Sequence, residues 1–309
     1  MTDSADSTLP TTTFSADLAK LQEDGFRLDM IYPADEPRVA ELSRDGETIR
    51  LEVPVEHTAP PVFNDELVLT RGGTWGEGRA GMQYRDLIPN RHGGNVIASH
   101  IRIVEPGPVP DYVHHHDIRF QMIYCRRGRV QVIYEDQGGA FWMEAGDCVL
   151  QPPHIRHRVL ASENACEVVE IASPSEHPTF VEHDIELPTP TLDPGRDFGG
   201  QRFSFDRSGE MAWVDGDRGW RTQSTGIEAA TAGLASVKVM KAATADATIS
   251  GSHSGDLFMF YVLEGSGSLT HNGSTNELTG DDSVAIPQGQ PWQLAAPAGD
   301  LTILVVEVT

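Results

Sequence analysis

One β-rich pattern occurs twice in this chain of 309 residues, and this internal repeat constrains the fold more than any other feature. The segment 97–104 (IASHIRIV) aligns with 234–241 (LASVKVMK), a shift of 137 positions. The same shift places Gly128 on Gly265 at the ends of two similar hydrophobic segments. Further along, 146–152 aligns with 281–287 at a shift of 135, so the second copy has a shorter loop. A repeat of this size predicts two similar structural units in tandem.

The repeated unit has the composition of a β-sandwich or barrel. Short segments rich in Val, Ile, Tyr and Phe are separated by Gly, Pro, Asn and Asp, which favours an all-β fold. The strands expected in the first copy are 95–104, 120–125, 129–134, 148–151 and 166–172, and those in the second are 233–239, 257–263, 283–287 and 301–308.

The remaining segments set the domain boundaries. Residues 1–62 lie outside the repeat and form an N-terminal extension, with a helix over 15–24 capped by Ser15 and strands at 25–32 and 48–53 around a charged loop. The barrels are expected at 63–190 and 191–309. Prolines and glycines within 187–200 mark the linker between them.

Charge and composition exclude several classes of partner. The chain has 23 basic and 46 acidic side chains, a formal charge of -23, which repels nucleic acid and anionic membranes. It has neither a signal-peptide pattern nor a long apolar run, so a cytoplasmic protein is expected. Its three cysteines, Cys125, Cys148 and Cys166, lie in apolar segments and are interpreted as reduced thiols of the core.

Histidines in the first copy form a candidate metal site. On a strand, alternate side chains share a face, so His114 and His116 point the same way and His115 points the other. His157, from a separate strand, can complete a three-nitrogen set that leaves the opposite coordination positions free. His115 and His154 are expected to be exposed or to support the ligands.

The order and spacing of these residues resemble the two motifs of the cupin superfamily, G-(x)5-H-x-H-(x)4-E-(x)6-G and G-(x)5-P-x-G-x-x-H. His114, His116 and Gly128 match the first motif, and Gly146, Pro152 and His157 match the second. The resemblance runs from about residue 62 to residue 309. It implies two tandem cupin barrels, which are double-stranded β-helix or jelly-roll folds, following the N-terminal β extension.

The sequence departs from the cupin pattern at three positions. Gln121 stands where the family has a metal-binding Glu, Pro108 replaces the first glycine, and His154 replaces the glycine of P-x-G. Without the carboxylate, the site resembles the three-histidine iron cupins, which include thiol and β-diketone dioxygenases. That resemblance implies Fe(II), with Zn, Ni, Mn or Cu as alternatives because imidazole suits all of them.

Other residues of the first copy are candidates for substrate contacts. Tyr112 shares the face of the histidines, and Cys125 shares the face of Gln121. Gln121 and Tyr112 are therefore predicted to orient substrate, Gln121 by hydrogen bonding or by coordinating through its carbonyl oxygen. Arg102 can meet a substrate carboxylate.

The second copy lacks the ligand set. Gly251, His253 and Phe258 occupy the positions of His114, His116 and Gln121, and Trp292 stands opposite His157. One imidazole does not hold a divalent ion, so the second barrel is expected to be metal-free and structural. A small-molecule pocket lined by Phe258 and Trp292 is the alternative.

Together these features predict a mononuclear non-haem Fe(II) dioxygenase. Its partners would be dioxygen and a small chelating substrate such as a diketone, hydroxyketone, phenolic or thiol compound, with a homodimer left open. Two alternatives stand beside it: a lyase or isomerase that uses Zn, Ni or Mn as a Lewis acid with Tyr112 as base, and a protein that binds a small ligand without chemistry.

Overall fold

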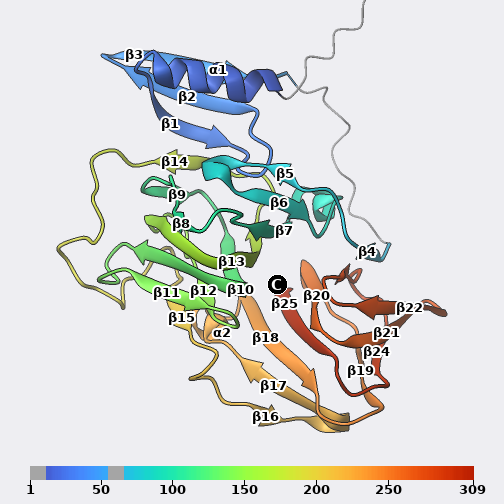
Figure 1. Cartoon of the computed structure of the whole chain (residues 1–309). Helices are drawn as coiled ribbons and strands as arrows, with labels where there is room; N and C mark the ends of the chain where they lie inside the picture. Colours follow the sequence, from blue (N-terminus) through green and yellow to red (C-terminus); the bar gives the residue numbers. More distant parts are fainter. Residues whose placement is uncertain (1–11, 55–65) are drawn as a thin grey trace, which may run out of the picture.

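The computed structural model describes residues 12–54 and 66–309, which form an N-terminal helix and sheet and two β-barrels (Figure 1). Strands dominate, so the all-β prediction is confirmed. All three cysteines are buried and unpaired, as expected. No helix within the described part of the chain is long and apolar enough to cross a membrane.

The N-terminal extension is one helix packed on three antiparallel strands, α1 (Thr12–Glu23), β1 (Arg27–Tyr32), β2 (Val39–Arg44) and β3 (Glu47–Glu52). Phe14 of the helix and Leu42 of the central strand are almost fully buried in their shared core. Two expectations were wrong here. The helix begins at Thr12, so Ser15 lies inside it. The predicted charged loop contains β2, whose apolar residues were obscured by the charged residues Glu41 and Arg44.

The hairpin between β2 and β3 has a local sequence signal that explains its turn. Asp45 and Gly46 are the two turn residues, and both have positive φ values, 50° and 83°. An Asp-Gly pair with this geometry is a preferred two-residue hairpin turn. The turn therefore fixes the register in which β3 returns along β2.

The first barrel begins after β4 (Val68–Thr70). Its elements are β5 (Gly76–Glu77), η1 (Arg79–Gly81), β6 (Gln83–Asp86), η2 (Arg91–Gly94), β7 (Ile97–Arg102), β8 (Gly107–Pro108), β9 (His114–His116), β10 (Phe120–Tyr134), β11 (Phe141–Glu144), β12 (Cys148–Leu150), β13 (His157–Ser173) and β14 (Thr179–Val181). The two strands predicted over 120–134 are one continuous strand, β10, with register shifts near its middle.

The second barrel repeats the arrangement. After β15 (Ser204–Asp206), its elements are β16 (Val214–Asp215), η3 (Asp217–Gly219), β17 (Trp220–Ser224), α2 (Ile227–Ala230), β18 (Ala235–Ala242), β19 (Ala247–Gly251), β20 (Leu257–Glu264), β21 (Ser266–His271), β22 (Ser274–Thr279), β23 (Ser283–Ala285), β24 (Trp292–Ala296) and β25 (Thr302–Val308).

Strand pairing shows that the sequence repeat is a structural repeat. The first barrel has the order β12-β10-β13-β7, and the second has the order β23-β20-β25-β18 in the corresponding segments. The loop between β14 and β15 contains the predicted linker 187–200. The two copies therefore share one topology as well as one sequence pattern.

Each barrel receives its edge strand from beyond the expected domain boundary. β15, which follows the linker, pairs with β12 of the first barrel, and β4, which precedes the first barrel, pairs with β23 of the second. This reciprocal exchange ties the barrels together through backbone hydrogen bonds. A cut at residue 190 would separate β15 from its partner, so the barrels are not independent along the chain.

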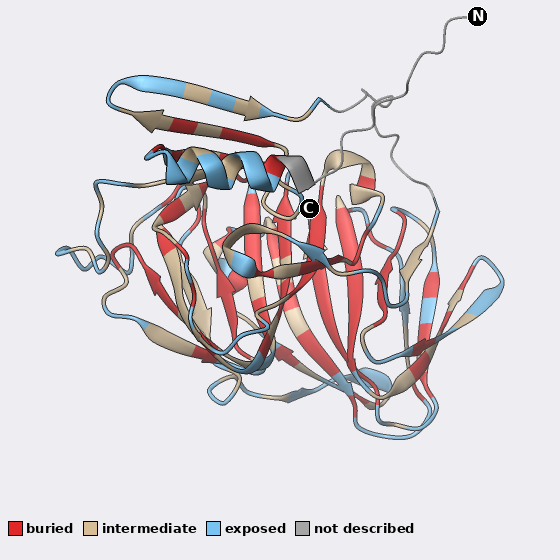
Figure 2. Cartoon of the chain, turned by 45° about the horizontal axis from the view of Figure 1, so that its top comes forward, coloured by how far each residue is buried: buried red, intermediate tan, exposed pale blue. Residues whose placement is uncertain are grey.

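The core of the molecule continues from one barrel into the other. One buried cluster joins Phe120, Met122 and Ile171 of the first barrel to Leu257 and Met259 of the second. Figure 2 shows buried strands, coloured red, at the centre of the molecule. The second barrel thus packs on the first through apolar side chains, and this large buried surface holds the two as one structure.

Gly128 is required where β10 passes β13. Its φ is +66°, and a Cβ at this position would lie 2.6 Å from the carbonyl oxygen of Glu163. We predict that Gly128→Ala destabilises the protein by about 2 kcal/mol because strain and collision act together. Gly139→Ala, where a Cβ meets nothing within 4 Å, should leave stability nearly unchanged. Urea unfolding of both variants measures this difference, and equal stabilities would contradict it.

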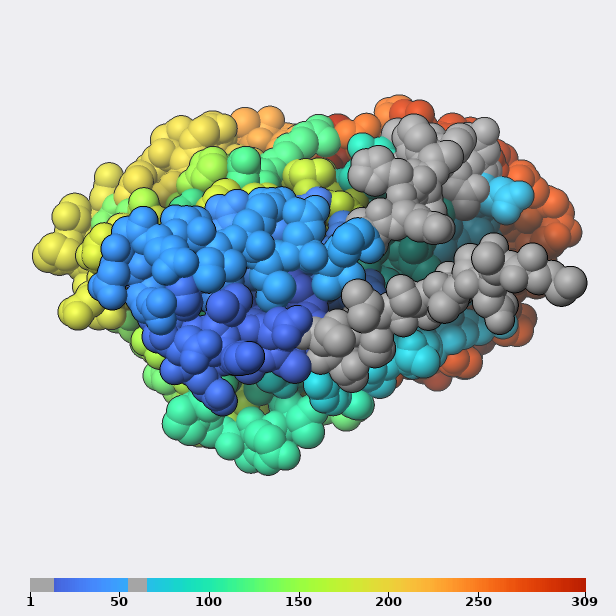
Figure 3. Space-filling model, turned by 90° about the horizontal axis from the view of Figure 1, so that it is seen from above, coloured from blue at the N-terminus to red at the C-terminus, as the bar shows by residue number. Residues whose placement is uncertain are grey.

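The N-terminal extension covers the first barrel. β1 pairs with β14 in antiparallel register, Met30 opposite Phe180. Figure 3 shows the extension in blue lying over the green and yellow first barrel, with the red second barrel to one side. The turn after β1 reaches farther inward, where the carbonyl oxygen of Ala34 accepts a hydrogen bond from the backbone of Arg79. The extension therefore contributes to the interior of the first barrel.

Candidate metal centre

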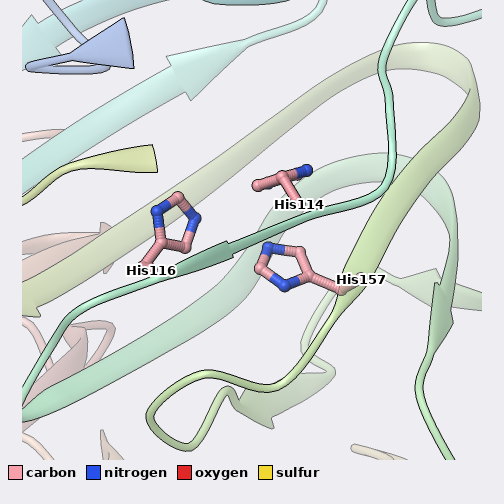
Figure 4. A group of neighbouring side chains, drawn as sticks. All are labelled: His114, His116 and His157. Atoms are coloured by element: carbon pink, nitrogen blue, oxygen red, sulfur yellow. The ribbon is translucent and has the colours of Figure 1, made fainter. Parts of the chain in front are cut away.

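Three histidine side chains meet inside the first barrel. His114 and His116 lie on β9 with His115 between them, and His157, the first residue of β13, pairs directly with His114. The strand alternation predicted from sequence turns the rings of His114 and His116 inward (Figure 4). Candidate ligand atoms of the three residues lie within 4.8 Å of one another, and all three are buried. The structure brings the predicted set together.

Backbone and hydroxyl groups orient each ring. Nδ1 of His114 lies 2.8 Å from the carbonyl oxygen of Tyr112, and Nδ1 of His157 lies 3.0 Å from that of Ile155. A carbonyl only accepts, so Nδ1 of both rings carries the donated hydrogen and Nε2 keeps its lone pair. Nδ1 of His116 lies 3.2 Å from the hydroxyl of Thr179. The two carbonyl contacts fix, for His114 and His157, the tautomer that binds a metal through Nε2.

The three imidazoles are neutral at physiological pH. Burial lowers the pKa of His114 and His116 well below the ordinary value of histidine, with further lowering from Arg79 at His114 and from neighbouring histidines at His116. Burial lowers the pKa of His157 to about 4. Metal binding requires unprotonated imidazole, so the site is ready to bind without releasing protons. The donor set therefore fits one divalent ion.

These pKa shifts predict a pH dependence of stability in the metal-free protein. The unfolded chain takes up a proton on His157 near pH 6.5, whereas the folded chain does so only near its lowered pKa of about 4. The contribution of His157 to stability is therefore present above pH 6.5 and is lost as pH falls from 6.5 to about 4, by about 1.4 kcal/mol per pH unit.

Urea unfolding of wild-type protein and of a His157→Gln variant at several pH values between 7 and 4 measures this contribution. Between pH 6.5 and about 4, the free energy of unfolding of the variant should fall less steeply with pH than that of wild type. The difference in slope should be about 1.4 kcal/mol per pH unit, the contribution of one proton. Identical slopes would show that His157 titrates normally in the folded chain.

A mostly apolar cavity opens beside the histidines. Its volume is about 80 Å³, whereas a cavity that holds one water molecule needs roughly 10–15 Å³. Its apolar walls come from Met82, Ile101, Ile123, Val130, Val132 and Val168, and its polar groups from Arg79, Gln121, Gln151, Glu170 and His177, beside His116 and His157. A small organic ligand with a few polar atoms fits such a space.

Arg79 is the charged residue closest to the histidines. Its Nη2 lies 2.8 Å from Nε2 of His114, and its Nη1 donates to Oδ1 of Asp111 at 2.6 Å. Both side chains are almost fully buried. A cation bound by His114 uses the lone pair to which Arg79 donates, so the guanidinium then needs another acceptor. An anionic ligand beside the metal would supply it.

Gln121 faces the same cavity through its amide. Its Nε2 donates to Oε1 of Glu170, and its buried Oε1 has no hydrogen-bond partner in the described part of the chain. Glu170 lies on β13 and also lines the cavity. Burial raises the pKa of Glu170, and the hydrogen bond from Gln121 offsets part of that rise. A carboxylate is therefore present near the histidines, although it is not at position 121.

Other predicted contacts lie elsewhere. Tyr112 packs edge-on against the ring of His114 and lines an outer groove beside the extension instead of the cavity. Arg102 donates to Gln83 at 2.7 Å and lies over the ring of Trp75. Cys125 is in the core of the first barrel but not on the cavity wall. None of the three is placed to touch a ligand in this cavity.

The two flanking histidines lie outside the cluster. His115 turns to the other face of β9, where its Nδ1 is 3.0 Å from the carboxylate of Glu182. His154 is exposed. Alternation along β9 separates His115 from the inward-facing pair, His154 lies in the turn before β13, and neither lies among the cavity residues.

Sequence reasoning missed Arg79 and Glu170. Arg79 precedes the first repeated strand and belongs to neither motif, so no spacing indicated it. Glu170 had a weak signal, since it interrupts the apolar run from Val168 to Ala172 in a strand whose neighbours are buried. A charge in such a run is retained when it has a partner or a role.

The equivalent positions of the second barrel are filled by packing. Gly251 pairs with Trp292 as His114 pairs with His157 in the first barrel. Nε2 of His253 donates to the carbonyl oxygen of Ile286 at 2.7 Å, and its ring stacks on Phe258, which stacks on Trp292. Phe258 and Trp292 belong to the hydrophobic core of the second barrel. The aromatic cluster thus occupies the place that the metal site has in the first.

Comparisons with solved structures identify the fold. A salicylate 1,2-dioxygenase from Pseudaminobacter salicylatoxidans is 17% identical over 70% of this chain and 71% of that chain, with a TM-score of 0.53. Oxalate decarboxylase from Bacillus subtilis is 12% identical over 86% and 85%, with a TM-score of 0.57. An 11S globulin from Wrightia tinctoria is 12% identical over 79% and 84%, with a TM-score of 0.58.

These similar structures are bicupins, and the chain accordingly has the tandem cupin fold that its motifs predicted. No model of a protein family and no curated protein matches the sequence. At such low identity the likeness concerns the fold alone, and the three neighbours differ in function by their names. The function must therefore be argued from the site.

Proposed function

We propose that this bicupin is a mononuclear non-haem Fe(II) dioxygenase that acts on a small chelating substrate, such as a diketone, hydroxyketone, phenolic or thiol compound. The observation that carries the proposal is the ligand set, three buried neutral imidazoles with no carboxylate among them. A divalent ion held by His114, His116 and His157 keeps its full charge. It therefore favours an anionic chelating substrate and leaves positions for dioxygen.

The residues around the site suit such a substrate. Bound Fe(II) would supply Lewis acidity and electrons for the reduction of dioxygen. Arg79 would donate to an anionic oxygen of the substrate once its contact with His114 is lost, and Asp111 holds the guanidinium in place. Gln121 would accept a hydrogen bond through its unpartnered oxygen. The apolar walls would exclude water from the reacting groups.

One of the similar structures supports the substrate class. Salicylate, named for the dioxygenase from Pseudaminobacter salicylatoxidans, is a phenol with an adjacent carboxylate and so belongs to the small chelating anions proposed here. The acidic exterior of this chain does not conflict with an anionic substrate, because Arg79 is buried inside the barrel beside the site.

Oxygen uptake tests the proposal. Protein loaded anaerobically with Fe(II) is mixed with acetylacetone, salicylate, catechol or cysteine in an oxygen-electrode cell. At least one chelator should cause uptake that requires both the metal and the chelator, while Zn(II)-loaded protein stays silent. Turnover that continues under nitrogen with Zn(II) would contradict the proposal and would favour a lyase or isomerase.

A further inference from the structure

The cavity contains an acid–base group that no motif indicated. Glu170 lines it together with His116 and His157, and its Oε1 accepts the hydrogen bond of Gln121. Because an ionised carboxylate only accepts, the amide nitrogen of Gln121 must face Glu170 and the amide oxygen must face away. That oxygen has no partner in the described chain. The cavity therefore presents two oxygen acceptors, from Gln121 and from Oε2 of Glu170, to a ligand that carries a hydrogen-bond donor.

Burial favours proton uptake by Glu170, whereas the polar groups around it act in both directions. Tyr84, His177 and Arg79 line the same cavity, and Asp35 lines a smaller adjoining pocket that Glu170 also reaches. Burial raises the pKa of Glu170, while the hydrogen bond from Gln121 and the charges of His177 and Arg79 lower it. The net shift is upward, so this carboxylate binds a proton more readily than an exposed glutamate does.

The tyrosine, glutamine and arginine side chains of the cavity are less suited to this task. Burial raises the pKa of Tyr84 and Tyr134 above the ordinary value of tyrosine, so both stay protonated at neutral pH. Gln121 and Gln151 have amides that do not take up a proton. Arg79 is a permanent cation. Among the described residues that line the cavity, Glu170 is the only carboxylate.

We propose that Glu170 is a catalytic residue that accepts the proton of the substrate's hydroxyl, enol or thiol group as the substrate binds beside the three histidines. This inference rests on the function proposed above. In the step, the substrate O–H or S–H bond breaks, its electron pair remains on the substrate oxygen or sulfur, and the proton forms a new O–H bond with Oε2 of Glu170. No oxidant or reductant takes part. Glu170 thereby supplies, from β13, the carboxylate missing at Gln121.

Proton counting with Zn(II)-loaded protein tests the role without turnover. Catechol, a diphenol that is not ionised at neutral pH, is titrated calorimetrically at pH 7 in two buffers of different ionisation enthalpy, which gives the protons released per catechol bound. Glu170→Gln keeps the size of the side chain and an acceptor for Gln121. The variant should release about one more proton per catechol than wild type and bind catechol at least about tenfold more weakly.

Two further variants accompany it. Glu163→Gln on the same strand removes a carboxylate that pairs with Arg129 and does not line the cavity, and it should release the same number of protons as wild type. Glu170→Asp keeps a carboxylate and should retain most of the proton capture. Zinc content and circular dichroism of each variant verify that the histidine site and the fold are intact.

The outcomes separate the two proposals. Equal proton release by wild type and Glu170→Gln, with catechol bound to both, would overturn the role of Glu170 and leave the metal site standing. Absence of zinc from the wild-type histidines, or of catechol binding to the zinc-loaded protein, would contradict the proposed function and with it the role of Glu170.

Discussion

Replacing His157 by alanine is expected to remove the metal ion, with metal content falling from about one ion per chain to below about one tenth. Two imidazoles from one strand, His114 and His116, remain, and they do not enclose a cation from a second side. Oxygen uptake with any chelating substrate should fall at least about a thousandfold, because the metal is lost and not merely displaced. Elemental analysis of protein purified without a histidine tag, followed by the oxygen electrode, measures both effects.

The matched control is His154→Ala. His154 lies three residues before His157 but is exposed, 3.6 Å from the exposed carboxylate of Asp117. This variant should keep its metal and its activity. A His157→Ala protein that retains metal at the wild-type level would show that the ion, if one is bound, is held elsewhere.

The second large effect is expected from Arg79→Met. Asp111 has a fully buried side chain, and Arg79 is its ion-pair partner at 2.6 Å. Methionine fills similar space but leaves the carboxylate without its counter-charge, although Asp111 keeps the hydrogen bond from the backbone of Val159. Removing one partner of a buried pair destabilises a protein by about 3–5 kcal/mol. Urea unfolding of the metal-free protein should show a loss of this size.

A double variant distinguishes the destabilisation caused by the unpaired buried charge from that caused by the loss of packing. Arg79→Met combined with Asp111→Asn removes both charges and should recover roughly half of the lost stability, as expected for residues that share one interaction. If the free energy of unfolding of Arg79→Met lay within about 1 kcal/mol of the wild-type value, this would contradict a structural role for the pair. Catechol binding to the zinc-loaded single variant would in addition report the loss of the anion-binding group.

The architecture was largely predictable because the repeat and the strand alternation act over many residues. The aligned segments at 97–104 and 234–241 became β7 and β18, with equivalent partners in their sheets. The pairing of β4 and β15 could not be predicted from the sequence. Each strand has only three residues and pairs with a strand of the other barrel, and so short a segment does not specify its partner. β2 was not predicted because its charged residues lie between the apolar ones, and the burial of its apolar residues is seen only in the structure.

The site was predictable where it follows local geometry. His114 and His116 are two residues apart on one strand, and His157 lies at the motif spacing, so their meeting follows from alternation and fold. Tyr112 was misplaced because the parity rule was extended to a residue outside the strand, which begins at His114. Arg79 and Glu170 reach the cavity from distant segments, and such contacts depend on the three-dimensional path of the chain.

X-ray absorption spectroscopy of protein loaded with one equivalent of Zn(II) tests whether His114, His116 and His157 together bind one metal ion. We predict a first coordination shell containing three imidazoles, with Zn–N distances of about 2.0–2.1 Å and the multiple scattering typical of histidine rings. The His157→Ala variant should lack this signature. A wild-type spectrum with only oxygen ligands, or with no imidazole scattering, would contradict the metal centre of His114, His116 and His157.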